Sequence, residues 1–150
     1  MADTQVQLQA EEWIVSNELP RMFSQGFSKT KLRLSWGGEF EFDAVSKDGS
    51  IAASVSTSRC RTAGGRPAVG KYHKIRSDVL YLLNAVGPKR RVLVFTDPEM
   101  VRRFEAESSH GRFPSADEIG LHLAKLPETL EEALGRARKN ASDEVSPGGK

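Results

Sequence analysis

The stretch KLRLSWGGEFEFDAVSKDGSIAASVS, residues 31–56, decides the fold of this chain. Apolar and polar residues alternate along it in runs of strand length, and two turn signals, Gly37-Gly38 and Asp48-Gly49, divide the runs. The pattern predicts strands over residues 32–36, 39–46 and 51–58 that pair as an antiparallel meander. Because Trp36 alternates in phase with the leucines before it, it is predicted to occupy a core position.

The segments that follow and precede the meander carry helical patterns and one further strand pattern. Residues 3–18 place apolar side chains at helical spacing, and Pro20 is expected to end this helix. Residues 71–86 form a second amphipathic helix. The apolar run RVLVFT, residues 91–96, predicts a buried strand, and Asp97-Pro98 begins another helix.

Two shorter amphipathic helices are predicted near the C-terminal end, over residues 115–125 and 128–139. Residues 141–150 are small, polar and glycine-rich, and are expected to form a disordered tail. No internal repeat or long linker interrupts residues 1–140, which are expected to form a single domain. The element order predicts an α/β fold with a mixed (α+β) sheet, followed by C-terminal helices.

The 150 residues carry a net charge of +2 that conceals a strong asymmetry along the chain. Residues 1–48 hold 5 Lys and Arg against 8 Asp and Glu, a net −3. Residues 49–103 hold 11 against 3, a net +8, and residues 104–150 hold 6 against 9, a net −3. A concentrated basic segment is typical of proteins that contact nucleic acid or another polyanion.

The sequence argues against several other classes of protein. One cysteine, Cys60, excludes an internal disulfide framework and a cysteine-based zinc cluster. The three histidines lack the spacing of a metal site, and the glycines after the third predicted strand form no nucleotide-binding fingerprint. The sequence shows no long apolar run and no secretory pattern at its start. We therefore expect a cytoplasmic protein that does not enter a membrane.

The basic segment provides a candidate nucleic-acid surface. Guanidinium and ammonium groups on a flexible, glycine-containing loop, residues 59–70, and on the helix after it suit contacts with phosphates. The alternative interpretation is a solvated loop and the outer face of a helix. The candidate contact residues, which no acid interrupts, are Arg59, Arg61, Arg66, Lys71, His73, Lys74 and Arg76.

Residues 3–107 resemble, in pattern and order, the core of the restriction-endonuclease-like (PD-(D/E)XK) nuclease superfamily: a helix, a three-stranded meander, a helix and a buried strand. In Gly38-Glu39-Phe40-Glu41-Phe42-Asp43-Ala44-Val45, Asp43 falls where that family has its metal-binding Asp. The family's acid-x-Lys motif is replaced here by Ser54-Val55-Ser56. The resemblance therefore implies a nuclease-like fold whose catalytic motif is degenerate, because a serine pair supplies neither a second carboxylate nor a lysine.

A rearranged site is the alternative that the resemblance leaves open. Carboxylates from the second strand and the first helix would hold Mg²⁺, and a lysine from the second helix would replace the missing one. The candidate metal ligands are Asp43, Glu41 and Glu12, and the candidate catalytic residues are Asp43, Glu41, Lys71 and Lys74.

Three functions follow as hypotheses. The first is a nucleic-acid-binding protein, with DNA the favoured partner, that serves as a non-catalytic component of a DNA-processing or defence system. The second is an active Mg²⁺-dependent nuclease with a rearranged site. The third is a protein-interaction module whose basic segment docks onto an acidic partner or onto a second copy of the chain, which would give a homodimer.

Overall fold

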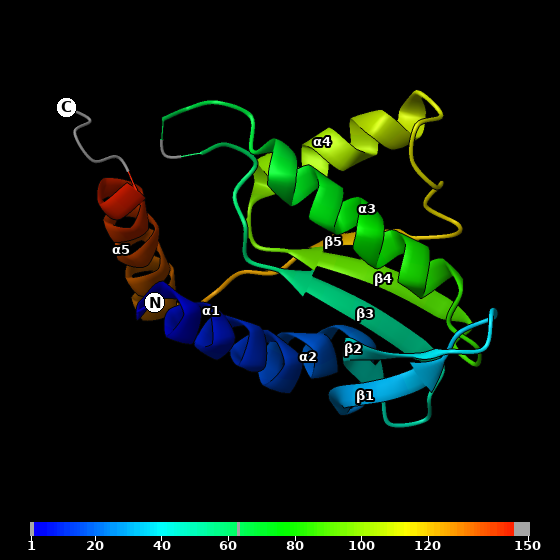
Figure 1. Cartoon of the computed structure of the whole chain (residues 1–150). Coiled ribbons are helices and arrows are strands. Elements are labelled where there is room, and N and C mark those ends of the chain that lie inside the picture. Colours follow the sequence, from blue (N-terminus) through cyan, green and yellow to red (C-terminus); the bar gives the residue numbers. More distant parts are fainter. Residues whose placement is uncertain (1, 63, 146–150) are drawn as a thin grey trace.

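The computed structural model describes residues 2–62 and 64–145, and within them one five-stranded mixed sheet forms the centre of the molecule (Figure 1). The strands keep their chain order across the sheet. The first three pair antiparallel, whereas the last two run parallel to the third. The strands are β1 (Phe27–Arg33), β2 (Glu39–Ser46), β3 (Ile51–Ser56), β4 (Arg90–Phe95) and β5 (Gly120–Leu123).

Helices cover both faces of the sheet (Figure 1). One apolar core joins the sheet to α3 and α4, and a second core joins its other face to α1 and α5. Successive side chains of β4 face opposite cores: Leu93 packs into the first core and Val94 into the second. The long helices are α1 (Ala2–Trp13), α3 (Val69–Leu83), α4 (Pro98–Ser109) and α5 (Glu128–Val145). In the described part of the chain, no helix is long and apolar enough to span a bilayer.

The predicted meander is confirmed. Gly49 adopts a φ of +78°, which an L side chain rarely tolerates, and Asp48 accepts hydrogen bonds that close the turn before it. The first strand begins at Phe27, earlier than residue 32, and the third ends at Ser56. β1 lies at the edge of the sheet, with Lys29, Lys31 and Arg33 exposed along it.

The first helical segment does not end at Pro20 as predicted. A π-helical turn, η1 (Ile14–Glu18), follows α1 and leads into α2 (Leu19–Phe23). Pro20 lies in the first turn of α2, directly after the π-helical turn, where the regular hydrogen-bond ladder of the helix is already interrupted. The helical path ends instead at Ser24, whose φ of +60° is left-handed.

The predicted helix over residues 115–125 is wrong. Residues 120–123 form the edge strand β5, which pairs parallel with Val92–Phe95 of β4. The helical spacing of Ile119 and Leu123 misled the prediction: Ile119 is buried as the chain enters the strand, while Leu123 is exposed. Tertiary pairing overrides a weak local pattern in so short a segment. The last helix is longer than predicted and ends at Val145, inside the expected tail. The remainder of that tail, residues 146–150, lies outside the described residues.

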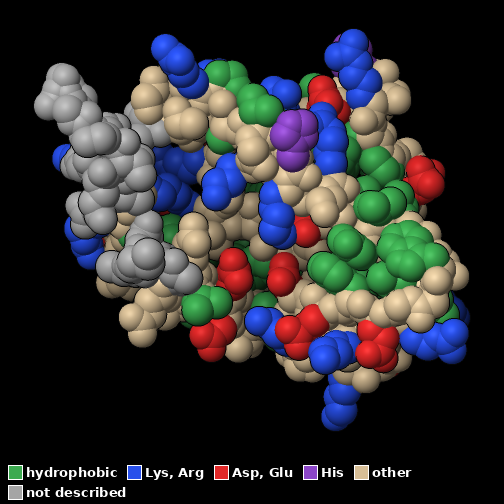
Figure 2. Space-filling model, viewed as in Figure 1, with side chains coloured by type: hydrophobic (Ala, Val, Ile, Leu, Met, Phe, Trp, Pro, Cys, Tyr) green, Lys and Arg blue, Asp and Glu red, His purple; other side chains and the backbone are tan. Residues whose placement is uncertain are grey.

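Trp36 is 55% exposed and does not occupy the predicted core position. Its ring meets the edge of Tyr81, which in turn stacks on Phe40. Leu80 and Val86 are also exposed near the C-terminal end of α3, and hydrophobic side chains gather over this end of the helix in Figure 2. The reason is the position of Trp36 in the β1–β2 turn, beyond the last paired residues of both strands.

The Asp48 turn gives a testable pH dependence. Hydrogen bonds from the Ser50 hydroxyl and backbone, and from the Ser46 hydroxyl, lower the pKa of Asp48 to about 2. The depressed pKa means that the carboxylate stabilises the fold above its unfolded pKa of about 3.9, and that this stability is lost as the pH falls toward 2. Between pH 5 and pH 2, the urea midpoint of the parent chain is therefore expected to fall further than that of Asp48→Asn. Equal falls in both chains would contradict the assignment.

Candidate functional site

A cleft of about 570 Å³ opens beside the carboxyl end of β3, between α1, the segment that follows β3 and the first half of α3. In open α/β sheets this edge is where ligands bind, because the segments that leave the strands diverge there. The cleft, which we call the acidic cleft, is lined in part by Gln7, Glu11, Ser56, Lys71, Lys74 and Asp78.

Asp43 lies beside this cleft, at the point where β2 and β3 separate. The two strands pair only through Ala44 with Ala53 and Val45 with Ala52. Beyond these pairs, the backbone N–H of Val55 donates to Asp43 Oδ2 at 2.8 Å. The carboxylate thus takes the place of a backbone acceptor where the ladder ends, and Asp43 has a structural role as well as a place in the site.

A bulge in β2 sets the direction of Asp43. Ser28 of β1 pairs with Val45 and Thr30 with Phe42, so that Asp43 and Ala44 together oppose the single residue Lys29. Phe42 packs into the core under α3, and Ala44 into the core under α1. The bulge therefore breaks the strict alternation of the strand at Asp43, as bulges near functional sites often do.

Glu41 does not join this cluster. It is exposed on β2 and opposite Lys31 of β1, just as Glu39 is opposite Arg33. A regular strand would place Glu39, Glu41 and Asp43 on one face, but the bulge in β2 breaks that alternation. Both glutamates instead lie opposite basic residues of β1 at the exposed surface.

The first helix contributes Glu11 rather than Glu12. Glu12 is exposed and does not line the cleft, whereas the neighbouring Glu11 is half-buried in its wall. Burial and the nearby charge of Asp43 raise the pKa of Glu11, and Lys29 and Lys74 oppose this rise. Glu11 and Asp43 are thus brought close together from α1 and β2.

The second helix contributes a lysine and a further carboxylate. Lys74 Nζ donates to both oxygens of Asp78, at 2.8 and 3.0 Å. Asp78 is only 7% exposed, and its pKa is raised: burial is the main cause, Lys74 opposes the rise and the charge of Asp43 adds to it. Lys71, the other candidate, is exposed at the cleft.

The resulting site is a set of carboxylates that repel one another around one lysine. Figure 2 shows acidic side chains grouped between α1 and α3, with basic side chains directly above them. Partial burial strengthens this repulsion because water screens it less. Among the described residues, no three carboxylates, histidines or cysteines stand close enough to hold a metal ion together. A divalent cation here would take two carboxylates and complete its shell with water or phosphate oxygens, as Mg²⁺ commonly does.

The predicted basic residues divide into paired and unpaired sets. Arg61 and Arg76 form ion pairs with Glu99 and Glu107, and Lys74 with Asp78. Within the described part of the chain, the remaining members have no carboxylate partner at ion-pair distance and are exposed: Arg59, Arg66, Lys71 and His73. These four side chains are available to a ligand.

Arg138 adds a cation that sequence reasoning missed. It reaches from α5 to donate a hydrogen bond to the carbonyl of Thr57, which lines the acidic cleft. Burial and the nearby Arg59 lower the pKa of Arg138. Two guanidinium groups thus lie near each other beside the cleft, an arrangement that a bound anion would relieve.

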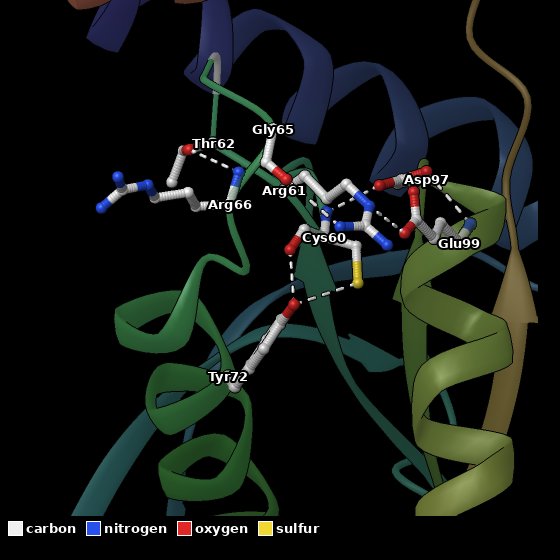
Figure 3. A network of polar contacts seen from close by, with 8 residues as sticks. All are labelled: Cys60, Arg61, Thr62, Gly65, Arg66, Tyr72, Asp97 and Glu99. Atoms are coloured by element: carbon white, nitrogen blue, oxygen red, sulfur yellow. Dashed lines mark hydrogen bonds and ion pairs between the residues drawn. The ribbon is translucent and has the colours of Figure 1, made fainter.

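Hydrogen bonds tie residues of the segment that follows β3 to α3, to α4 and to one another (Figure 3). The N–H of Cys60 donates to Asp97 Oδ2 at 2.7 Å, and the Tyr72 hydroxyl donates to the Cys60 carbonyl at 2.5 Å. Arg61 bonds Glu99 Oε2 and the Gly65 carbonyl, so that one side chain ties the loop to α4 and to itself. The Arg66 side chain points away from this network in Figure 3.

Glu11 and Asp78 are the carboxylates of the site that the sequence prediction did not include. Glu11 is adjacent to Glu12, and only the packing of α1 decides which of the two meets the cleft. Asp78 carries a clearer signal, since an acid four residues after Lys74 on an otherwise basic helix forms a pair along the helix. Its burial depends on the tertiary approach of α1 and β2.

No family model, curated protein or solved structure significantly matches this chain. The functional argument therefore depends on the residues of the acidic cleft and on the charges around it.

The raised pKa of Glu11 predicts that this carboxylate lowers the stability of the fold at neutral pH. The pKa of Glu11 is higher in the folded chain than in the unfolded chain, so the protonated carboxyl stabilises the fold at low pH. This stabilisation is lost as the pH rises through the folded pKa. Glu11→Gln is therefore expected to increase the free energy of unfolding by up to about 1 kcal/mol at pH 7. Urea unfolding at pH 7 and pH 4 measures this gain, which should vanish at pH 4. Glu12→Gln is the matched control, and an equal gain in that variant would contradict the prediction.

Proposed function

We propose that this protein binds nucleic acid across the acidic cleft, with the phosphate backbone held by its unpaired cations. The observation that carries the proposal is the grouping of three cations at one cleft: Lys71 lines it, Arg138 bonds the Thr57 carbonyl in its wall, and Arg59 lies near Arg138. None of the three forms an ion pair with a carboxylate among the described residues. Phosphates satisfy exposed guanidinium and ammonium groups of this kind, and the release of counterions supplies much of the affinity.

The fold supports the same proposal. A meander followed by a helix and a parallel strand produces an antiparallel-then-parallel sheet, with Asp43 at the fork and the cleft beside it. This arrangement is the one expected of a restriction-endonuclease-like core. Under this proposal Ser54 and Ser56 of β3 stand where that family carries its acid and lysine.

The proposal has a direct test in the salt dependence of binding. Fluorescence anisotropy with labelled duplex DNA, single-stranded DNA and RNA would give the affinity of the chain for each. With three phosphate contacts, the logarithm of the binding constant is expected to fall against the logarithm of salt concentration with a slope of roughly −3 on duplex DNA. Binding that is absent, or that does not change with salt, would contradict the proposal.

A second candidate function is divalent-cation-dependent hydrolysis of a phosphodiester. The convergence of Glu11, Asp43 and Lys74 favours it, since these groups come from three different elements. Glu11 and Asp43 supply hard oxygen donors of the kind that Mg²⁺ and Mn²⁺ prefer. Lys74, now paired with Asp78, is placed to neutralise phosphate charge or orient an attacking water.

A further inference from the structure

A second cleft, of about 340 Å³, lies on the other side of the loop that follows β3. It is an open cleft bordered by residues of that loop, by Tyr72 of α3 and by one side of α4. Pro67 lines both this cleft and the acidic cleft, so the loop forms a ridge between the two. Its wall includes Cys60, Tyr72, Arg102 and Arg103. We call it the arginine cleft.

The charges of the arginine cleft do not balance. Its two acids are already neutralised, because Glu99 pairs with Arg61 at 2.7 Å and Glu107 with Arg76 at 2.5 Å. No carboxylate among the described residues lies at ion-pair distance from Arg102 or Arg103. Two cationic side chains therefore line a concave surface without counter-charges.

Arg103 is held in a fixed orientation. Its guanidinium carbon lies 3.9 Å from the centre of the Tyr72 ring. Tyr72 is itself fixed, because its hydroxyl contacts the carbonyl and Sγ of Cys60 and its ring meets the edge of Phe104. A stacked guanidinium has lost its rotational freedom before any ligand arrives, which lowers the entropic cost of binding.

Arg103 also carries an unsatisfied donor. Its Nε is the only buried side-chain nitrogen or oxygen among the described residues that has no hydrogen-bond partner. An unpartnered buried N–H is unfavourable in the free protein. Because this Nε is buried, an anion in the cleft would meet the two terminal Nη groups of Arg103, whose N–H bonds lie side by side and match two oxygens of a phosphate group.

We propose that the arginine cleft binds the terminal phosphate of a nucleic-acid strand whose adjoining phosphates lie in the acidic cleft, an inference that rests on the proposed function. A terminal phosphate monoester carries a charge of about −1.5 to −2 at pH 7. This charge matches the two unpaired arginines, whereas an internal phosphodiester carries only one negative charge. The shared Pro67 ridge places the two clefts next to each other, so that one strand end contacts both.

The test compares oligonucleotides that differ only in the terminal phosphate. Single strands with a 5′-phosphate, a 3′-phosphate or hydroxyl ends are titrated by anisotropy against the parent chain, Arg102→Gln, Arg103→Gln and the control Arg112→Gln. Arg112 is exposed and does not line the cleft. One terminal phosphate is expected to tighten binding by the parent chain and the control roughly 10-fold. Each cleft variant should lose most of this gain, while its affinity for the hydroxyl-ended strand stays within about two-fold.

The outcomes separate this inference from the proposed function. Equal affinity for phosphorylated and hydroxyl-ended strands, with binding retained, would overturn the arginine cleft as a phosphate site and leave nucleic-acid binding standing. No binding of any strand would overturn both. Calorimetric titration with inorganic phosphate supplies an independent measurement. Weak binding of phosphate by the parent chain, lost in Arg102→Gln, supports the site. This comparison still holds if loss of the contact with the Tyr72 ring prevents Arg103→Gln from folding. An absence of phosphate binding by the parent counts against it.

Discussion

Simultaneous substitution of Arg59 and Lys71 by glutamate is expected to weaken binding of duplex DNA by roughly 10- to 100-fold at moderate salt. Both side chains are exposed beside the acidic cleft, and neither has a carboxylate partner among the described residues. The double variant removes two phosphate contacts and adds two repulsive charges. The slope of the binding constant against salt should therefore become shallower by about two. Anisotropy at several salt concentrations measures both quantities.

Lys47→Glu combined with Lys89→Glu is the matched control, because it changes the net charge by the same amount. Both residues are exposed at the amino end of β3, where Lys47 lies in the hairpin turn and the Lys89 N–H bonds the Ser50 carbonyl. They are therefore at the opposite end of the strand from the acidic cleft. If the control pair weakened binding as much as the cleft pair, overall charge would explain the affinity and the location of the surface would be wrong.

Asp43→Ala is expected to produce two separate losses. Removal of the carboxylate leaves the Val55 N–H without its acceptor, which should lower the free energy of unfolding by about 1–2 kcal/mol. Under the second candidate function, the same change removes one of the two oxygen donors for a divalent cation. Cleavage of plasmid or single-stranded DNA in Mg²⁺ or Mn²⁺ should then fall by roughly 100-fold.

Asp43→Asn separates these two effects, because its amide oxygen can still accept from Val55 while the charge is gone. We expect this variant to keep most of the parent's stability in urea unfolding and to lose cleavage as fully as Asp43→Ala. If the parent cleaves and Asp43→Asn cleaves equally well, Asp43 takes no part in the chemistry. If the parent cleaves no nucleic acid with either cation, the second candidate function fails, and the stability comparison still tests the Val55 contact.

Local chemistry made much of the fold predictable. The Asp48-Gly49 turn forms through local hydrogen bonds, such as that from the Ser50 N–H to the Asp48 carboxylate. In the same way, the Asp97 carboxylate accepts from the N–H of Glu99 and begins α4 as predicted. β5 was missed because its four residues acquire strand structure only from pairing with β4. The helix that continues past Pro20 depends on a π-helical turn that leaves no clear pattern in the sequence.

The candidate site was predictable to a smaller extent. Of the predicted residues, Asp43 lies beside the cleft and Lys74 lines it, because strand order and helix position bring them there. Their catalytic and metal-binding roles stay predictions. Glu11 was missed in favour of Glu12, because one residue along a helix corresponds to a rotation of about 100° and only packing fixes the phase. Glu41 was chosen because the alternation of a regular strand was assumed, and the bulge opposite Lys29 breaks that alternation.

The exposed cations of β1 have a consequence for the behaviour of the protein at high concentration. An edge strand offers unpaired backbone groups to which another chain can add, and this is a common route to aggregation. Here Lys29, Lys31 and Arg33 would meet the same three charges of a second copy that approached in an antiparallel direction. Growth of the sheet from one molecule into the next is therefore opposed by electrostatic repulsion, and we expect concentrated solutions to stay clear for longer at low salt than at high salt.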